Sequence, residues 1–326
     1  MTNSFPLPPN ERNVRPLHLG DFIGQAHIKR ALNIMLHSAK VRGATLEHLA
    51  FYGNAGLGKT TLAAIIANEM GSQLHEVAAP ALKDFSDLIK ILDRLAPNDV
   101  LFLDEIHALR ADLAETLYSA LEDFKVTKKT LGEDNRSKAL VTEEIAPFTL
   151  VGSTTDLGKL PGPMLARFGQ RFLLRPYTKS ELSAILSRAA LKFGYLTDEP
   201  GLMALAVRAH GTPRVALRLL RRCIDVAVSV QADFIDEELV ETTMDILGTD
   251  PLGLEDVDRL YLSTLVQVYG GGPASAQAIS ANAGLDVTTA QRLTEPTLLQ
   301  LGLIKRTPDG RRVTKKGLNH YQTHIA

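Results

Sequence analysis

Three short apolar runs in the first half of the chain predict the strands of a buried sheet. The runs are "LEHLAFYG" (46–53), "DVLFLDEI" (99–106) and "PFTLVGST" (147–154), and each is nearly continuously apolar until polar residues or a glycine end it. Stretches with helical spacing separate them, among them "TTLAAIIANEM" (60–70) and "ADLAETLYSALEDF" (111–124). Strands that alternate with helices are typical of a parallel sheet covered on both faces. Functional residues of such a sheet gather at the carboxyl ends of its strands.

The hydrophobic pattern becomes purely helical after Tyr177, and four consecutive helices are predicted up to residue 247. The glycines and proline of "GTDPLGLED" (248–256) then indicate a linker or tight turn. The remaining residues predict three helices followed by a short hairpin turned at Asp309-Gly310, which is the pattern of a winged helix. We therefore expect a flexible N-terminal arm, an α/β domain, a small all-α domain and a winged-helix domain, at residues 1–16, 17–177, 178–249 and 250–326.

Composition narrows the classes of protein that fit this pattern. The net charge of −1 offers no overall attraction for nucleic acid, so any DNA contact must come from a local patch. The single cysteine, Cys223, excludes an internal disulfide and a cysteine-cluster metal site, which fits a reducing compartment. No apolar run reaches the roughly 18 residues of a membrane span, and residues 1–16 lack the apolar core of a signal peptide. We expect a cytoplasmic protein.

The segment "GNAGLGKT" (53–60) matches the phosphate-binding pattern G-x-x-x-x-G-K-[ST] at every required position. Its glycines allow the backbone N–H groups to face phosphates, and the following helix adds a favourable dipole. Lys59 would lie between the β- and γ-phosphates, and Thr60 would offer its hydroxyl to Mg²⁺. A chance glycine-rich turn is the alternative, which the flanking strand and helix disfavour. The residues assigned to the nucleotide from this segment and the next position are Gly53, Gly56, Gly58, Lys59, Thr60 and Thr61.

The second apolar run ends in two carboxylates, as "VLFLDEIH" (100–107) shows. Asp104 would complete the Mg²⁺ shell together with Thr60, and Glu105 would orient and polarise the attacking water. The alternative is a strand that leads into an acidic loop. We interpret His107 as a supporting or structural residue rather than a catalytic one.

The third run ends in hydroxyls at "LVGSTT" (150–155). Thr154 or Thr155 could therefore contact the γ-phosphate or the attacking water. Taken alone the pattern is weak, because Ser and Thr are also common in turns at strand ends.

The segment "HGTPR" (210–214) begins a predicted helix in the all-α domain. Thr212 could cap that helix, and Pro213 suits its first position. Arg214 would then lie in the first turn, where its charge opposes the helix dipole, so a bound phosphate is the expected partner. A surface salt bridge is the alternative.

Arg167 lies within "GKLPGPMLARFGQRF" (158–172), among small residues and prolines for which no helix or strand is predicted. From the local sequence alone, a solvated surface charge is the favoured interpretation.

With these motifs in this order, the chain resembles the RuvB family of AAA+ ATPases from about Arg15 to Arg312. The resemblance implies a homo-hexameric ring with ATP and Mg²⁺ bound at the subunit boundaries, and a motor that drives branch migration on DNA. The segments that carry it are "RPLHLGDFIGQ", "FYGNAGLGKTTLA", "DVLFLDEIH", "PFTLVGSTT", "ARFG", "HGTPRVALRLLRR", "YGGGP" and "LLQLGLIKRTPDGR".

The resemblance also implies roles for particular residues. It makes Arg167 an arginine finger that reaches the γ-phosphate of the neighbouring subunit, a contribution of about 10³–10⁵ in rate. Residues 15–25 and Tyr177 would border the adenine. The winged helix would face duplex or four-way junction DNA, with a solvated basic tail as the alternative for its basic cluster. The arginines assigned to DNA are Arg306, Arg311 and Arg312.

Several positions differ from the pattern of the family. Asn54-Ala55 replaces two prolines, Asp156 replaces an arginine close to the site, and Asp309 replaces an arginine at the hairpin tip. Residues 125–146 form a predicted hairpin that is more polar than the family's docking hairpin for the junction-binding protein RuvA. A RuvA-like partner is therefore doubtful, and a diverged paralogue with altered partner surfaces fits these differences.

Three hypotheses of function follow. The first is an ATP-hydrolysing motor that moves duplex DNA at Holliday junctions in recombination and repair. The second is a clamp-loader-like or remodelling ATPase that acts on another protein–DNA assembly. The third is an ATP-dependent switch or scaffold, which the intact set of predicted site residues disfavours.

Overall fold

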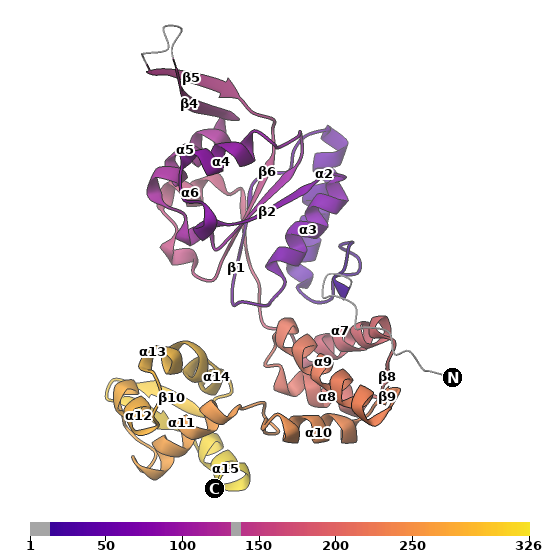
Figure 1. The fold of residues 1–326 in the computed structure, drawn as a ribbon, viewed down its shortest axis with the longest axis vertical. Helices are drawn as coiled ribbons and strands as arrows, with labels where there is room; N and C mark the ends of the chain where they lie inside the picture. Colours follow the sequence, from indigo (N-terminus) through magenta and orange to yellow (C-terminus); the bar gives the residue numbers. More distant parts are fainter. Residues whose placement is uncertain (1–13, 132–137) are drawn as a thin grey trace. The chain divides into compact units, whose positions relative to one another are not determined.

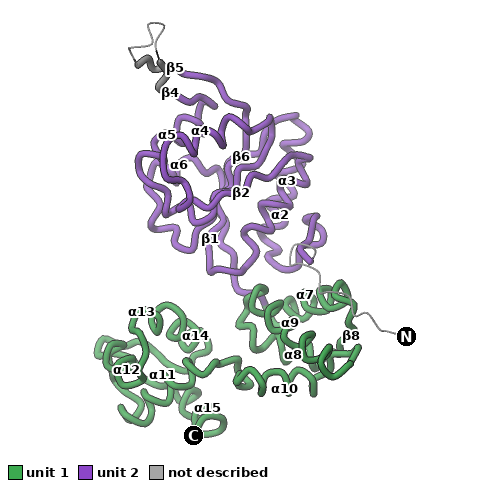
Figure 2. The backbone as a smooth tube through the Cα atoms, in the orientation of Figure 1, with its two compact units in different colours: residues 1–9, 178–326 green, residues 10–177 purple. Residues whose placement is uncertain are grey.

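A computed structural model describes residues 14–131 and 138–326 of the chain (Figure 1). These residues divide between Tyr177 and Thr178 into two compact units, called first and second here in chain order, which are unit 2 (purple) and unit 1 (green) in Figure 2. Most of the predicted N-terminal arm and nearly all of the charged hairpin tip lie outside the described residues. Val14, which we expected to belong to the arm, is buried.

The first unit is built on a five-stranded parallel sheet with the strand order β2-β3-β6-β1-β7. The three predicted strands, β1, β3 and β6, are confirmed and form its centre. The outer strands β2 and β7 were not predicted, because half-exposed edge strands lack a continuous apolar run. The strands are β1 (Leu49–Tyr52), β2 (Leu74–Ala78), β3 (Val100–Asp104), β6 (Thr149–Thr154) and β7 (Gln170–Leu173).

Helices cover both faces of this sheet, with α2 and α3 on one side and α4, α5 and α6 on the other (Figure 1). Helix α5 buries Leu113, Leu117 and Leu121, which recur every four residues, in the core that also holds the apolar side chains of β3 and β6. The helices are α2 (Ala26–Arg42), α3 (Lys59–Met70), α4 (Phe85–Leu92), α5 (Ala111–Glu122) and α6 (Gly162–Arg167), and short 3₁₀ turns lie at 79–81, 106–108 and 157–159.

The predicted hairpin is confirmed as β4 (Lys125–Leu131) and β5 (Lys138–Glu144), which pair antiparallel from Lys125 opposite Glu144 to Leu131 opposite Lys138. Lys128 lies 2.8 Å from Asp93 and 2.7 Å from Glu143. The hydrogen bonds that Lys128 donates to these two carboxylates raise its pKa. The described part of the hairpin is therefore a charged surface.

The second unit begins with the four predicted helices, α7 (Lys179–Phe193), α8 (Glu199–Arg208), α9 (Pro213–Val230) and α10 (Glu237–Ile246). A capping box between Thr178 and Glu181 starts α7. The prediction of helices alone was wrong in one detail, since β8 (Leu196–Thr197) and β9 (Phe234–Ile235) form a two-residue parallel pair. Two-residue strands carry too little periodicity to be recognised in a sequence.

The C-terminal part confirms the predicted helices and hairpin of a winged helix. Its third helix is divided by a π-helical turn, and a further helix, α15, was not predicted. Pro308 and Asp309 form the hairpin turn, whereas Gly310 already belongs to β11, where a Cβ would meet the carbonyl oxygen of Ala274 at 2.5 Å. The elements are α11 (Asp256–Gln267), α12 (Ala276–Asn282), α13 (Val287–Thr289), π-turn η4 (Ala290–Thr294), α14 (Glu295–Gln300), β10 (Ile304–Thr307), β11 (Gly310–Val313) and α15 (Lys315–His324).

The segment 248–256 forms a tight turn that bonds to both neighbouring domains. One oxygen of the Asp250 carboxylate accepts the N–H groups of Leu252 and Leu254, each at 2.9 Å, and the other lies 2.6 Å from His320 Nε2 on α15. Arg208, at the end of α8, donates to the carbonyl oxygen of Asp250. These hydrogen bonds identify the segment 248–256 as a tight turn, the second of the two predicted possibilities, rather than a linker.

No helix within the two described stretches combines the length and the hydropathy needed to cross a bilayer.

The loop before β1 is held to the sheet by the partly buried imidazole of His48. The N–H of Leu150 on β6 donates to His48 Nδ1 at 3.0 Å, so Nε2 carries the proton and donates to the carbonyl oxygen of Leu121 at 3.0 Å. Burial lowers the pKa of His48, against smaller opposing effects of the Leu121 carbonyl and Glu47. The neutral ring is therefore the form that this contact requires.

We predict that acid weakens this contact. Because the folded-state pKa is depressed, the stabilisation is complete above the ordinary histidine pKa of about 6.5. This stabilisation is lost as the pH falls from about 6.5 through the lower pKa that His48 has in the folded chain. The loss amounts to about 1.4 kcal/mol for each pKa unit by which folding lowers the pKa. Calorimetry between pH 8 and 5.5 should show that the wild-type chain has a higher free energy of unfolding than His48→Gln, and that this difference becomes smaller as the pH falls. The exposed His37→Gln is the control, and a constant gap for His48→Gln would contradict the prediction.

Candidate nucleotide and transfer site

The phosphate loop lies between β1 and α3, as its sequence predicts. Gly53, Gly56 and Gly58 have φ values of 134°, 79° and 102°, which favour glycine. A Cβ on Gly53 would also lie 2.6 Å from the carbonyl oxygen of Leu174. Only glycine therefore fits at this position, where the loop passes directly over the chain that follows β7.

Lys59 begins α3 and is 7% exposed. Its Nζ donates to the carbonyl oxygens of Gly53 and Asn54 at 2.8 and 3.0 Å, which places the charge inside the loop. Thr60 and Thr61 follow in the first turn of the helix. The ammonium group and the helix N-terminus therefore create a positive potential at the same place.

The segment that the family resemblance assigns to the adenine packs beside this loop. A Cβ on Gly58 would lie 3.3 Å from the ring of Phe22 and 3.6 Å from the hydroxyl of Tyr177. Tyr177 donates that hydroxyl to the carbonyl oxygen of Leu57 at 3.1 Å. Gln25 bonds through its amide to both the N–H and the carbonyl of Arg175. These contacts join the N-terminal segment, the loop and the end of the first unit.

Asp104 ends β3 beside the end of β6, because these two strands are neighbours in the sheet. The Ser153 hydroxyl donates a short hydrogen bond to Asp104 Oδ1, and the N–H of Glu105 donates to the same oxygen at 3.1 Å. Two donors thus orient the carboxylate, and no described residue donates a hydrogen bond to its Oδ2, which can take a further ligand. Ser153 was not among the predicted site residues, because its contact with Asp104 depends on the pairing of β3 with β6.

Glu105 has a left-handed backbone, with φ 51° and ψ 45°, which a non-glycine residue adopts at a cost of roughly 1–3 kcal/mol. Its Oε2 is buried, lies 3.1 Å from His107 Nδ1 and makes no hydrogen bond within the described residues. His107 Nδ1 instead bonds to the Thr154 hydroxyl at 2.8 Å. The imidazole therefore connects the two predicted catalytic groups, which fits the supporting role predicted for it.

Thr154 is fully buried at the end of β6, and its hydroxyl also accepts the N–H of Asp156 at 3.0 Å. Thr155 is exposed. Of the two hydroxyls left open by the sequence, Thr154 is the one fixed between the strand ends. Asp156 caps the next 3₁₀ turn and pairs with Lys159 at 3.5 Å, so its charge is partly balanced.

Arg167 is the last residue of α6, so the prediction of a loop at this position was wrong. Its guanidinium lies 4.8 Å above the ring of Tyr118, 2.8 Å from the Glu122 carboxylate and 2.9 Å from the Pro163 carbonyl oxygen. The buried Nε makes no hydrogen bond within the described residues. The side chain is thus held by α5 rather than solvated.

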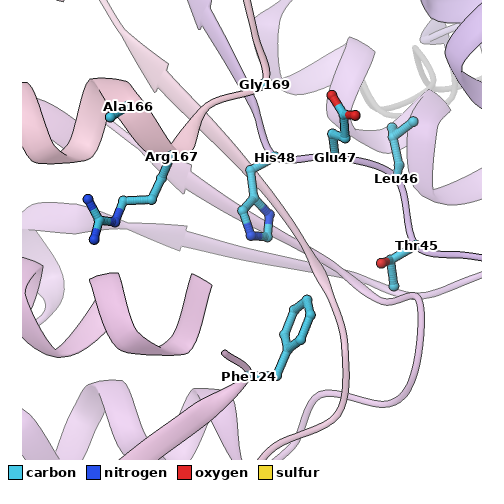
Figure 3. Close-up of a pocket in the computed structure, with 8 residues that line it drawn as sticks. All are labelled: Thr45, Leu46, Glu47, His48, Phe124, Ala166, Arg167 and Gly169. Carbon is cyan, nitrogen blue, oxygen red and sulfur yellow. The ribbon is translucent and has the colours of Figure 1, made fainter. Parts of the chain in front are cut away.

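A cavity of about 320 Å³ lies beside Arg167, at the opposite strand ends from the phosphate loop. Figure 3 shows the guanidinium directed away from His48 and Phe124, which line the same cavity. The next residue, Phe168, is buried, and its ring would lie 2.9 Å from a Cβ on Gly152 of β6. A glycine in β6 therefore makes room for the ring of Phe168, the residue next to Arg167, against the strand that carries Thr154.

Arg214 lies in the first turn of α9, exposed and without an ion pair inside the described stretches. Pro213 takes the first helical position as predicted, but the Thr212 side chain makes no capping bond. Because Arg214 belongs to the second compact unit, its role at the nucleotide stays a prediction.

Two of the three arginines predicted to bind DNA have an internal partner. Arg306 and Arg311 lie 2.8 and 2.7 Å from the carboxylate of Glu295, which is fully buried. Arg312 is partly exposed and lies opposite Lys305 in the register of the two hairpin strands. Sequence spacing does not reveal Glu295 as the partner, since the contact joins a helix to a hairpin.

Family models match almost the whole described chain. They are described as the Holliday junction DNA helicase RuvB P-loop domain, the RuvB AAA lid domain and the RuvB C-terminal winged helix domain. They match residues 14–174, 177–250 and 251–322. The chain belongs to the RuvB family.

Relatives of the same family align over nearly their full length. The Holliday junction branch migration complex subunit RuvB of Thermotoga maritima is 41% identical over 312 residues, which cover 96% of this chain and 93% of the relative. The protein of the same name from Oenococcus oeni is 41% identical over 313 residues, covering 96% and 92%. The solved structure of the Thermotoga maritima RuvB Holliday junction branch migration motor matches with a TM-score of 0.81 at 40% identity, covering 96% of this chain and 100% of that chain. The predicted fold class, with its parallel sheet, lid and winged helix, is confirmed.

The geometry of this RuvB family site fits a nucleotide with Mg²⁺. The glycine conformations and the buried Lys59 form a cradle for phosphates, and the open oxygen of Asp104 with the Thr60 hydroxyl suits a hard cation. Within the described residues no cluster of three His, Cys, Asp or Glu side chains could hold a metal by itself. A magnesium ion here would depend on the phosphates for its remaining ligands.

We predict that Glu105→Gln binds ATP but hydrolyses it about 10²–10⁴-fold more slowly, because an amide cannot polarise the attacking water. Single-turnover hydrolysis and the binding of a fluorescent ATP analogue measure the two steps separately. Glu115→Gln, at an exposed position of α5, is the matched control. Normal turnover of Glu105→Gln would contradict the assignment.

Proposed function

We propose that this chain is an ATP-hydrolysing motor that moves duplex DNA and drives branch migration at Holliday junctions. One observation carries the proposal. At one edge of the sheet lie the phosphate loop, Asp104, Glu105 and Thr154, in a chain that belongs to the RuvB family. Relatives over 96% of the chain bear the name of a branch migration complex subunit. All three family models that match this chain, including the one for the C-terminal winged helix, are models of RuvB domains. A clamp loader is therefore not favoured.

Each residue of the site would have a defined role. Bound ATP with Mg²⁺ supplies the phosphoryl group and most of the charge compensation. Lys59 would leave the loop carbonyls for the β- and γ-phosphates, and Asp104 with Thr60 would hold the magnesium shell. Glu105 would orient the attacking water, while Thr154, positioned through His107, would contact the γ-phosphate or that water.

We further infer that Arg167 acts on the ATP of a neighbouring subunit in a homo-hexameric ring. In the single chain the guanidinium pairs with Glu122, whose side chain is 58% exposed. The Arg167 side chain itself is only 19% exposed, so what favours exchange is the exposed carboxylate, which returns to water when a phosphate takes its place. Stacking on Tyr118 would keep the side chain extended during that exchange.

The described part of the β4–β5 hairpin supports a polar docking surface. Thr127 and Thr142 bond across the strands at 3.0 Å and Lys128 is paired on both sides, whereas Val141 adds one exposed apolar side chain. We infer that a junction-binding partner of the RuvA type would meet charged and hydroxyl groups here rather than an apolar face.

The motor is tested by steady-state ATP hydrolysis with no DNA, linear duplex and four-way junction DNA at one fixed low salt concentration. We predict DNA stimulation together with ATP-dependent dissociation of a labelled junction. Lys59→Ala is the control that removes ATP use. Basal hydrolysis that neither DNA form changes, with or without a RuvA-type protein, would refute a DNA motor.

The trans role of Arg167 is tested by mixing subunits. We predict that Arg167→Ala and Lys59→Ala are each inactive, whereas a mixture regains part of the activity, because some interfaces then combine an intact Lys59 with an intact Arg167. Arg171→Ala, at an exposed position of β7, is the control for a lost surface charge. Wild-type activity per subunit should also fall on dilution. Activity that is independent of concentration, without rescue on mixing, would exclude a finger acting in trans.

A further inference from the structure

One nitrogen of the His107 ring faces two oxygens of the nucleotide site. His107 Nδ1 lies 2.8 Å from the Thr154 hydroxyl and 3.1 Å from Glu105 Oε2. Only the contact with Thr154 has the geometry of a hydrogen bond, and Glu105 Oε2 is buried without a hydrogen-bond partner among the described residues. Two predicted catalytic groups therefore compete for a single ring nitrogen.

The surroundings of Thr154 indicate which nitrogen of the His107 ring carries the proton. The Thr154 hydroxyl accepts the N–H of Asp156 at 3.0 Å and has one hydrogen of its own to donate. If Nδ1 had no proton, it would place a hydrogen-bond acceptor 3.1 Å from the buried oxygen of Glu105, which is unfavourable. With a proton on Nδ1, an N–H lies beside Glu105 and the hydroxyl hydrogen of Thr154 is left for a ligand. We therefore assign the proton to Nδ1.

The backbone fixes the His107 ring more firmly than the carboxylate of Glu105. The N–H of Ala108 donates to the carbonyl oxygen of Glu105 at 2.8 Å and closes the 3₁₀ turn that carries the ring. Ile106 of the same turn is buried, and its side chain would lie 3.1 Å from a Cβ on Gly152 of β6. The side chain of His107 is 19% exposed, whereas that of Glu105 is 38% exposed. A change of hydrogen-bond partner therefore requires only a rotation of the Glu105 side chain.

Thr154 would no longer need the ring once its hydroxyl donates to a γ-phosphate. It would then donate to the phosphate and accept from Asp156, which satisfies the hydroxyl on both sides. The Nδ1–H of His107 would be available to Glu105. Such a bond to a carboxylate is charge-assisted, and charge-assisted bonds are roughly twice as strong as those between neutral groups. Held through Oε2, Glu105 would present Oε1 to the attacking water.

We propose that His107 is a positioning residue that passes its Nδ1 hydrogen bond from Thr154 to Glu105 when a γ-phosphate is bound. The inference rests on the proposed ATP hydrolysis and specifies how that site is regulated. Glu105 would be oriented for hydrolysis only after Thr154 has met the γ-phosphate. The supporting role that the sequence indicates for His107 thereby gains a defined hydrogen bond.

Two replacements separate this hydrogen bond from the bulk of the ring. An asparagine amide offers an N–H close to the position of Nδ1, whereas alanine removes the donor. His107→Ala should slow single-turnover hydrolysis of ATP by up to about 10²-fold, as expected for a misplaced catalytic group. The binding of a fluorescent ATP analogue should stay unchanged, and His107→Asn should keep most of the rate. Because His107 acts through Glu105, adding His107→Ala to Glu105→Gln should slow hydrolysis no further.

The position of the proton is tested without any hydrolysis. In the full chain labelled with ¹⁵N-histidine, the chemical shift distinguishes a ring nitrogen that carries a proton from one that does not. The spectrum of His107→Asn identifies which signals belong to His107. We expect the proton on Nδ1, and a change in the shift of Nδ1 with Mg²⁺ and a non-hydrolysable ATP analogue but not with ADP. The exposed His37→Ala is the control and should change neither the shift nor the rate.

The outcomes distinguish this inference from the proposed function. A proton on Nε2 instead of Nδ1 would overturn the inference, as would a His107→Asn that is as slow as His107→Ala while the wild-type chain hydrolyses ATP. If His107→Ala lowers the temperature of unfolding, the response of the Nδ1 signal to the ATP analogue still decides. A wild-type chain that binds ATP but does not hydrolyse it would refute the proposed function, and the positioning role would fail with it.

Discussion

The chemistry of this chain depends on one geometric constraint, that parallel strands end at the same edge of a sheet. The phosphate loop follows β1, Asp104 ends β3 and Thr154 ends β6, and β6 lies between the other two. Residues about 50 positions apart therefore meet without a long excursion of the chain. The same neighbourhood lets Ser153 orient Asp104 and lets His107 join Glu105 to Thr154.

Ion pairs and hydrogen bonds determine which charged side chains are fixed within the chain and which can bind a ligand. Glu295 binds two arginines inside the winged helix, and Asp250 bonds the turn at 248–256 to both of its neighbours. Arg167 pairs with the exposed carboxylate of Glu122, which suits the proposed exchange of that partner for a phosphate. The buried carboxylates of Glu295 and Asp250 therefore stabilise the second unit, whereas the exposed carboxylate of Glu122 can give up Arg167 in the proposed role of that arginine.

Much of the fold could be predicted from periodicity. The continuous apolar runs identify β1, β3 and β6, and the helical spacing identifies α7 to α10. The edge strands β2 and β7, the short pair β8–β9 and the helix α15 were not recognised. Their apolar positions are too few or too exposed, and pairing with neighbours stabilises them instead.

The sequence by itself determined the phosphate loop and the acidic strand end, because each is a local pattern whose spacing the chemistry requires. Only the tertiary structure decided that Thr154 rather than Thr155 is fixed at the site, and that Arg167 rests on Tyr118 and Glu122. It also placed the buried Glu295 beside Arg306 and Arg311 of the hairpin. The physical reason is common to all three. A side chain's partner is set by which strands and helices lie side by side, and residues distant in sequence supply that partner.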